Sequence, residues 1–497
     1  MKHTWIALFF TFPIFLQAQS ENIFHDRSFW STQPNVDVIR QKIAEGHDAE
    51  ALDPNAFDAV TSAINSGAPL ETIKFLLSLE GNDVNKHTHD GRNYLMWAGR
   101  SGNIEIVKIL LEKGSRTDIT DSHGYNFLTF TAASGNTDIE LYDLILDHEV
   151  SVHSTTRSGA NVLHILAASI KDKNMIDYFV EKGLDIHSRD DEGNGMFNYA
   201  AKGGNIELME HLIKMGLDYK KLNSKGENAL FFATQGSRGY TNPLSVYKFL
   251  EGLGFEVDIV NFDGQTPIHN LSRSARDMEI INYFIDNGVN INQVDRNGNT
   301  AFMNAVSAGN TVVAESLLSE VKEINLQNKE GYSALSYAIM RSSGELVDLL
   351  KVHGADFSIL DANGNNLVYH LFNSYSNRTK DGFDPLFELL KEKGLGLAES
   401  FENGNTLAHI AIEKEEKGLL VKAIDSNVEI NQKNDDGLTP LHLAAMKAKN
   451  NEILNILLDS GADKSILTEF EESAFDLASE NEALKKAKLD LKFLKIN

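Results

Sequence analysis

The sequence predicts an all-α solenoid of about twelve helix pairs, each stacked on the next. A turn glycine recurs at intervals of 33 to 40 residues, and self-similarity at such a period is typical of repeat architectures. After each turn, two short segments carry apolar residues at helical spacing. The turn glycines are Gly91, Gly124, Gly159, Gly193, Gly226, Gly264, Gly298, Gly331, Gly364, Gly404 and Gly437, and a last unit has Glu471 at the turn position.

Each unit is predicted to be an antiparallel helix pair. An apolar residue stands four positions after the turn in nearly every unit, and alanine is frequent seven positions after it. The small alanine side chain allows two helices to approach closely. One pair leaves an apolar face uncovered, so neighbouring pairs must stack to bury it. The recurrent alanines include Ala98, Ala200, Ala305, Ala338 and Ala444.

The segment between units is predicted to form a short, hairpin-like projection, here called a finger. An extended piece leads into a turn such as 295–298, where Gly298 supplies the positive φ that the reversal requires. Asp or Asn usually stands three residues before the turn position, as at Asp121, Asp190 and Asn261. A short polar side chain there can accept backbone N–H bonds, so we expect it to hold the turn.

The pattern resembles the ankyrin repeat over about residues 35 to 490. The run Gly437-Leu-Thr-Pro-Leu-His-Leu-Ala-Ala445 is close to the family consensus, and Gln265-Thr-Pro-Ile-His269 is a partial match. The resemblance implies an ankyrin-repeat solenoid with β-hairpin-like fingers and capping ends. It also implies that partners meet the finger tips and the exposed faces of the first helices. The periodic histidines His164, His269, His409 and His442 would then bond within the scaffold.

Four regions follow from this reading of the chain. Residues 1–18 are expected to be a signal peptide and residues 19–52 an N-terminal cap. The repeat array is expected over 53–470, and a truncated repeat with a C-terminal cap over 471–497. Polar ends of this kind prevent an open apolar face from recruiting another copy, so we expect a monomer.

The first eighteen residues have the layout of a secretion signal. A positive start at Lys2 is followed by an apolar stretch, Trp5 to Leu16, and by the small residue Ala18. The alternatives are a membrane anchor or a buried helix, but the apolar stretch is shorter than the roughly 20 residues that span a bilayer, and it contains Pro13. The sequence therefore predicts export, with cleavage before Gln19 and no membrane insertion afterwards. Periplasm and extracellular space both remain open.

Composition restricts the classes of partner. Apolar residues make up 42% of the 497 residues and charged residues 24%, as in folded proteins. The formal net charge is −25; such a surface repels nucleic acid and favours a protein partner with a basic patch. There is no cysteine, which excludes disulfides, thiol catalysis and thiolate metal sites.

No motif for catalysis, a cofactor or a metal is found, so we predict no enzyme, no cofactor and no metal site. The sequence contains no phosphate-binding loop, no His-Glu-x-x-His and no Gly-x-Ser-x-Gly elbow. His87 and His89 flank one finger beside Asp90. A metal site is the alternative there, but a solvated finger is favoured because nothing in the sequence fixes the rings as ligands.

Seven finger residues are the candidates for partner binding. They are large aromatic or basic residues at positions where the repeat itself does not require them, which is the composition of interface anchors. The alternative is that they are ordinary exposed residues. Two insertions between helices, 236–243 and 373–384, are predicted loops that either contact a partner or are tolerated surface additions. The seven candidates are His89, Arg92, Tyr125, Arg157, Phe262, Arg296 and Tyr332.

These observations favour a non-catalytic protein-binding scaffold outside the cytoplasm, with the partner held in a concave groove of finger tips and first helices. The alternative is an exported enzyme, or an enzyme-accessory protein, with a small-molecule or glycan site in that groove. A mechanical or surface-layer protein that stacks end to end is a third possibility, and the polar ends argue against it.

Overall fold

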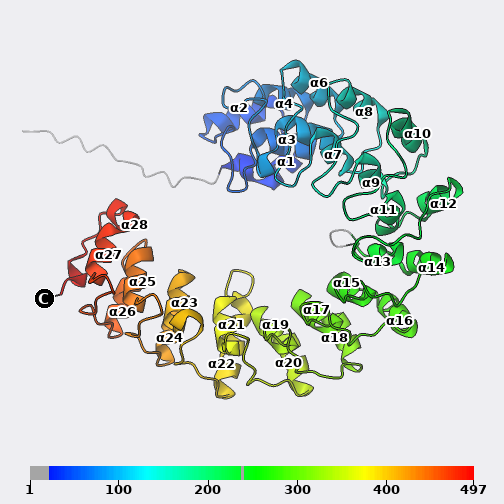
Figure 1. Cartoon of the computed structure of the whole chain (residues 1–497). Coiled ribbons are helices and arrows are strands. Elements are labelled where there is room, and N and C mark those ends of the chain that lie inside the picture. Colours follow the sequence, from blue (N-terminus) through cyan, green and yellow to red (C-terminus); the bar gives the residue numbers. More distant parts are fainter. Residues whose placement is uncertain (1–21, 237–239, 497) are drawn as a thin grey trace, which may run out of the picture. The chain divides into compact units, whose positions relative to one another are not determined.

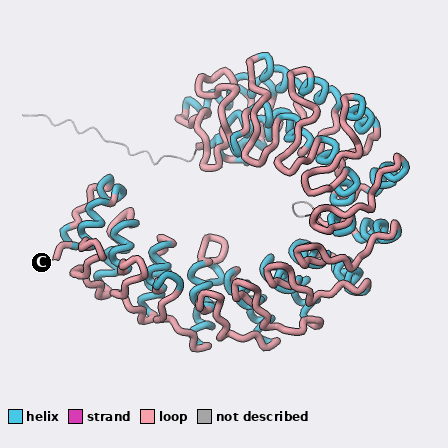
Figure 2. Tube along the Cα trace, viewed as in Figure 1, coloured by secondary structure: helices cyan, strands magenta, loops and turns pink. Residues whose placement is uncertain are grey.

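A computed structural model describes residues 22–236 and 240–496. The chain divides into two compact units with their boundary between Asn223 and Ser224, and each is described by itself. The predicted signal peptide lies outside the described residues. Within the described part the fold is helical and contains no strand (Figure 2). An isolated antiparallel bridge joins Arg189 and Gly195, so the fingers are tight turns rather than paired strands.

The first unit begins with three short helical elements and continues with five helix pairs (Figure 1). The opening elements are η1 (Ile23–His25), α1 (Arg27–Ser31) and α2 (Val36–Ala44). The pairs are α3 (Ala59–Ser66) with α4 (Leu70–Leu76), α5 (Tyr94–Ser101) with α6 (Ile104–Glu112), α7 (Phe127–Ala132) with α8 (Ile139–Leu146), α9 (Val162–Leu166) with α10 (Asn174–Glu181), and α11 (Met196–Lys202) with α12 (Ile206–Lys214). The turn η2 (His89–Gly91) precedes α5.

The second unit continues the same pattern. Its pairs are α13 (Ala229–Ala233) with α14 (Leu244–Gly252), α15 (Pro267–Ser274) with α16 (Met278–Asp286), α17 (Ala301–Ala308) with α18 (Thr311–Leu318), α19 (Ala334–Met340) with α20 (Gly344–Val352), α21 (Leu367–Asn373) with α22 (Lys380–Glu392), α23 (Leu407–Glu413) with α24 (Lys417–Asp425), α25 (Pro440–Lys447) with α26 (Glu452–Asp459), and α27 (Ala474–Glu480) with α28 (Glu482–Lys486). Two short turns, η3 (Glu402–Gly404) and η4 (Lys492–Leu494), complete it.

The first helix of each pair starts at a fixed distance from its finger. The N-cap lies two residues after the turn position, and it is usually Asn, Ser or Thr, whose side chain satisfies free backbone N–H groups. Asn126 and Thr439 form capping boxes, and Pro440 occupies the first turn of α25. The finger and the helix start are therefore specified together by one short stretch of sequence.

The core lies between the helices of neighbouring pairs. First helices pack on first helices, as α5 does on α7 and α15 on α17. The recurrent alanines Ala98, Ala200, Ala305, Ala338 and Ala444 are all buried. This confirms that the small side chain occupies the position of close helix approach.

The second insertion is not a loop throughout, which corrects the prediction for 373–384. Residues 380–384 form the beginning of α22, and Phe383 is completely buried. Its ring packs edge-on against Phe372, with centroids 5.3 Å apart, and stacks on the ring of Phe387. The added residues thus lengthen a helix and contribute a core side chain.

Candidate functional site

Seven of the finger turns are closed by an Asp or Asn that stands three residues before the turn position. In the finger at Gly124, the Asp121 N–H donates to the Tyr125 carbonyl at 2.8 Å. The Asp121 carboxylate accepts the N–H groups of His123 and Tyr125 at 2.9 and 2.8 Å. The same pair of side-chain bonds is made by Asp190, Asn261, Asp295, Asn328, Asp361 and Asn434. The predicted role of this residue is confirmed.

Backbone hydrogen bonds also join one finger to the next, which the sequence pattern did not indicate. At eight tips an N–H donates to a backbone carbonyl at the preceding tip. In the first unit these bonds run from His89 to Ala56, from Ser122 to Asp90 and from Asp191 to Ser158. In the second they run from Phe262 to Lys225, Arg296 to Asp263, Lys329 to Asn297, Ala362 to Glu330 and Asp435 to Asn403. Within each unit we call these bonded fingers the finger row.

The periodic histidines lie behind the fingers as scaffold residues. In His164, Nδ1 accepts the Asn161 N–H at 3.2 Å, so Nε2 carries the proton and donates to the Ser188 carbonyl at 3.0 Å. His269, His409 and His442 make the equivalent pair of bonds. Burial lowers the pKa of all four, because the charged imidazole is poorly solvated there.

Among the candidates in the first unit, Arg92 is not an exposed finger residue, contrary to expectation. It is 7% exposed. Its Nε and Nη2 contact Asp121 Oδ2 at 2.7 and 2.6 Å, and Nη1 lies 3.0 Å from Asp90 Oδ2. The guanidinium covers the Phe130 ring at 4.2 Å and the Trp97 ring at 5.1 Å. These contacts hold the side chain inside the unit.

The other three candidates of the first unit reach the surface. His89 stacks on Phe57 with ring centroids 4.6 Å apart, and its Nε2 lies 3.4 Å from Asp90 Oδ2. Tyr125 is half-buried beside Phe130. Arg157 is exposed and donates to the Ser122 carbonyl at 2.7 Å.

His123 joins this part of the finger row although it was not among the seven candidates. Its Nε2 lies 3.2 Å from Asp90 Oδ2, so His89, Arg92 and His123 converge on one carboxylate. His123 stands at the finger tip, directly before its turn glycine. That position is the sequence feature by which His123 could have been identified as a finger residue. The three side chains therefore gather around Asp90.

The candidates of the second unit differ in how firmly they are held. Phe262 is 72% exposed, with its ring lying over Gly226 of the preceding finger. Arg296 is exposed and pairs with Asp263 at 2.8 Å. Tyr332 is half-buried between Tyr337 and His370, and burial raises the pKa of its hydroxyl. Phe262 and Arg296 therefore lie on successive fingers with their side chains at the surface.

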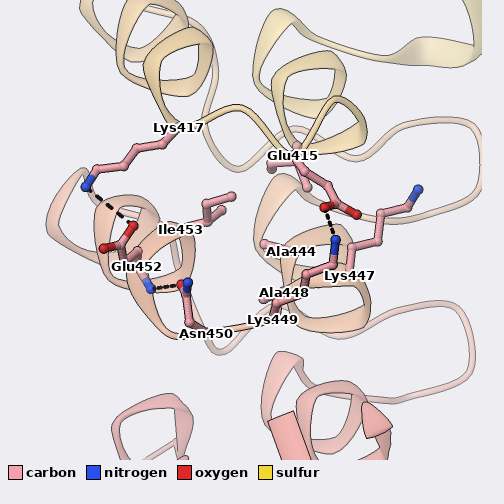
Figure 3. Close-up of a pocket in the computed structure, with 10 residues that line it drawn as sticks. Glu415, Lys417, Ala444, Lys447, Ala448, Lys449, Asn450, Glu452 and Ile453 are labelled. Carbon is pink, nitrogen blue, oxygen red and sulfur yellow. Dashed lines mark hydrogen bonds and ion pairs between the residues drawn. The ribbon is translucent and has the colours of Figure 1, made fainter. Parts of the chain in front are cut away.

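A cavity at the opposite end of the first helices contains none of the candidates. It has a volume of about 140 Å³ and lies where the helices of two successive pairs join, α23 to α24 and α25 to α26 (Figure 3). Lys417 pairs with Glu452 at 3.5 Å, and Lys449 with Glu415. These pairs are solvent-exposed, and such pairs contribute at most about 1 kcal/mol each. They link neighbouring repeats.

The described residues contain neither a candidate metal site nor a helix that could cross a membrane. No three His, Asp or Glu side chains of residues 22–236 and 240–496 are arranged to hold a metal ion. In the same described ranges, every helix is too short or too polar to cross a bilayer.

Stacked helix pairs with a bonded finger row define a repeat protein of the helical solenoid class. The sequence profile described as ankyrin repeats (three copies) matches residues 31–121, 163–244, 239–328, 268–361 and 377–468. The chain belongs to the ankyrin repeat family. Ankyrin repeats are generally protein-binding scaffolds, and the fold is typically non-catalytic.

The individual relatives are distant and longer. Transient receptor potential cation channel subfamily A member 1 of Homo sapiens is 23% identical over 418 residues, 76% of this chain and 37% of that protein. Palmitoyltransferase AKR1 of Lachancea kluyveri is 25% identical over 169 residues, 33% of this chain and 22% of the enzyme. The solved ankyrin repeat domain of human ASB11 has a TM-score of 0.39 and 21% identity, covering 47% of this chain and 99% of that one. The match thus spans less than two fifths of the length of the channel and of the palmitoyltransferase.

Proposed function

We propose that this chain is an exported, non-catalytic scaffold that binds a protein partner on the finger row and the adjoining faces of the first helices. The observation that carries the proposal is the finger row itself. Seven of the turns are closed by an Asp or Asn side chain, and eight tips carry a backbone bond to the preceding finger. A preformed surface needs little ordering on association, which leaves more of the contact energy for binding.

Phe262 and Arg296 are the anchors that the second unit offers for this role. Both project from consecutive fingers, and aromatic and Arg side chains dominate the energetics of interfaces. Because the Arg296 N–H is bonded to the Asp263 carbonyl at 2.6 Å, the two fingers keep their spacing. An exposed phenyl ring beside an ion pair suits a partner surface that combines an apolar pocket with charged neighbours.

The charge of the chain supports a partner with a basic patch. A net charge of −25 speeds the encounter with positive surfaces more than it tightens the final complex. We expect the association rate to fall as salt is raised, because a Debye length of about 8 Å at physiological ionic strength shortens with added salt. An association rate that is independent of salt would argue for an uncharged partner surface.

The binding proposal is tested by capture from the host's extracytoplasmic extract. The bait is the chain from Gln19 onward, as wild type, as Phe262→Ala and as Val352→Ala, with crosslinking and mass spectrometry as the readout. Val352 is 81% exposed on α20. The control Val352→Ala therefore removes an exposed apolar side chain, as Phe262→Ala does, but away from the fingers. We expect one protein to be captured by the wild type and Val352→Ala and lost by Phe262→Ala. Equal capture by all three baits would contradict a contact at Phe262.

Export is tested separately, because binding and location can fail independently. We expect the protein purified from its host to begin at Gln19 and to be found outside the cytoplasm as a monomer. Cell fractionation gives the location, N-terminal sequencing gives the first residue, and light scattering gives the mass of the oligomer. A cytoplasmic protein that retains its first eighteen residues would refute export, and growing oligomers would favour end-to-end stacking.

A further inference from the structure

Three aromatic rings meet where two neighbouring fingers of the second unit adjoin. The His370 ring contacts those of Tyr332 and Tyr369, with centroids 5.2 and 5.3 Å away. Tyr332 follows the turn of its finger, and the other two residues belong to α21, which packs on α19 of the preceding pair (Figure 1). Both tyrosines are half-buried and His370 is 4% exposed. The two tyrosine rings therefore reach the surface beside a buried imidazole.

Three successive fingers each add a carboxylate to these rings. The carboxylates are those of Glu330, Asp361 and Glu402. Burial raises the pKa of the Tyr332 hydroxyl, and the charges of all three carboxylates raise it further. The Tyr369 hydroxyl donates to Glu402 Oε2 at 2.9 Å. We call the two tyrosines, His370 and the three acidic residues the tyrosine–carboxylate cluster.

Neutral donors hold the carboxylates of this cluster in place. Glu402 Oε1 accepts from Asn363 Nδ2 at 3.2 Å, and Glu330 Oε2 accepts from Asn328 Nδ2 at 3.0 Å. Asp361 Oδ1 accepts the Asn363 backbone N–H at 2.9 Å. Hydrogen bonds from amides fix the positions of the carboxylates but leave their negative charge uncompensated.

No cation of the second unit compensates this charge. Among the described residues, no lysine or arginine forms an ion pair with any of the three carboxylates, and the base that faces them is His370. Its Nε2 lies 3.3 Å from Asp361 Oδ2 and makes no hydrogen bond. Burial lowers the pKa of His370, although the charges of Asp361 and Glu402 act in the opposite direction. The imidazole is therefore neutral at neutral pH, and the cluster keeps an excess of negative charge.

We propose that the tyrosine–carboxylate cluster binds a lysine or arginine side chain of the protein partner. The carboxylates of Glu330 and Glu402 are exposed and can contact the cation. The Asp361 side chain is only 4% exposed, so it acts through its charge alone. Tyrosine rings attract cations and also cover the apolar stem of a long basic side chain. This inference rests on the proposed function, because it assigns the partner's basic patch to one place in the finger row.

The test titrates the whole chain with short peptides that carry one basic side chain. The probes are acetyl-Gly-Lys-Gly-amide and its arginine counterpart, and the control carries Nε-acetyl-lysine, which has the same stem without the charge. The ring signals of Tyr332 and Tyr369 are followed by NMR in ¹³C-tyrosine-labelled protein and assigned with Tyr332→Phe and Tyr369→Phe. We expect saturable shifts with the charged peptides and an affinity at least about tenfold lower for the acetylated control. The tighter of the two charged peptides assigns the type of side chain.

Charge-removing variants test whether the carboxylates of the cluster are responsible. Glu330→Gln and Glu402→Gln keep the size of the side chain, and the double variant should bind the charged peptides about tenfold more weakly or worse. Glu315→Gln, at an exposed position of α18, removes the same charge away from the fingers and should bind as the wild type does. Equal binding of the acetylated peptide, or equal affinities of the double variant and Glu315→Gln, would overturn the proposal.

The double variant also separates this inference from the proposed function when it is used as bait in the capture experiment. We expect it to lose the captured protein, whereas Glu315→Gln keeps it. If the double variant keeps a protein that Phe262→Ala loses, the finger-row function stands and this inference is refuted for that partner. If the charged peptides bind but no protein is captured, the cluster recognises basic side chains and the protein-binding function fails instead.

Discussion

At the scale of single residues, the same side-chain type has different consequences depending on what lies around it. Arg92 and Arg157 occupy comparable places on fingers, and sequence alone treats them alike. Arg92 follows its turn glycine directly and meets the rings of Trp97 and Phe130 beside two carboxylates. Arg157 precedes its glycine and lies at the surface with one carbonyl as its partner. Exposure therefore depends on the neighbouring repeat, which the pattern of one repeat does not describe.

The contrast predicts unequal losses of stability. Arg92→Ala should lower the free energy of unfolding by about 3 kcal/mol or more, because Asp121 would keep a fully buried carboxylate without its countercharge. Arg157→Ala should cost less than about 0.5 kcal/mol, as is usual for exposed positions. Urea titrations of both variants with the wild type measure the difference. Similar losses for the two variants would contradict the burial of Arg92.

At the scale of elements, the finger and the helix pair were predictable to different degrees. Capping residues and the turn motif are local, so the helix starts and the finger turns could be deduced from the sequence. The bonds between fingers are not local, because they use backbone atoms that carry no side-chain signature. The added residues at 380–384 were predicted to form a loop because extra residues in a repeat usually map to a loop on one face. Burial of Phe383 outweighs that preference.

The finger row also predicts that equivalent glycines differ in their tolerance of substitution. Gly331 and Gly364 have nearly the same positive φ, 80° and 83°. A Cβ on Gly364 would meet nothing within 4 Å, whereas on Gly331 it would overlap the Ala362 backbone nitrogen in the next finger. Gly364→Ala should therefore cost about 1–2 kcal/mol for the left-handed conformation alone. Gly331→Ala should cost more, since two bonded fingers must separate.

Thermal and urea unfolding of the two glycine variants provide the measurement. The difference between them isolates the contact between fingers, because the backbone strain is common to both. Equal destabilisation would mean that neighbouring fingers are not held together as tightly as the bond from Ala362 to Glu330 indicates.

At the scale of the whole molecule, the repeat fold could be predicted from the sequence and the binding surface only in part. The period of the turn glycines and the scaffold histidines determined the family and the register. Phe262 and Arg296 are at the surface as their positions suggested, while Arg92 is buried. Identity of a partner is not encoded in any of these local patterns.

Because the scaffold histidines recur in both units, their protonation should affect the stability of the molecule as a whole. Burial lowers the pKa of His164, His269, His409 and His442, so the unfolded chain binds protons more readily than the fold does. Stability is then fully present above the unfolded pKa of about 6.5 and is lost as pH falls below it. Carboxylates with lowered pKa values titrate near or below about pH 4, outside this window.

Urea unfolding at about pH 7.5 and about pH 5.5 should therefore give a lower free energy of unfolding at the acid value. His409→Asn removes one buried histidine with a lowered pKa and should reduce that pH dependence while lowering stability at both values. His353→Asn, at the exposed histidine that caps the C-terminal end of α20, is the matched control and should leave the pH dependence unchanged. An equal free energy of wild-type unfolding at these two pH values would contradict the contribution of neutral, buried imidazoles. A pH dependence that His409→Asn reduces and His353→Asn does not would tie the acid sensitivity to the bonds that join one repeat to the next.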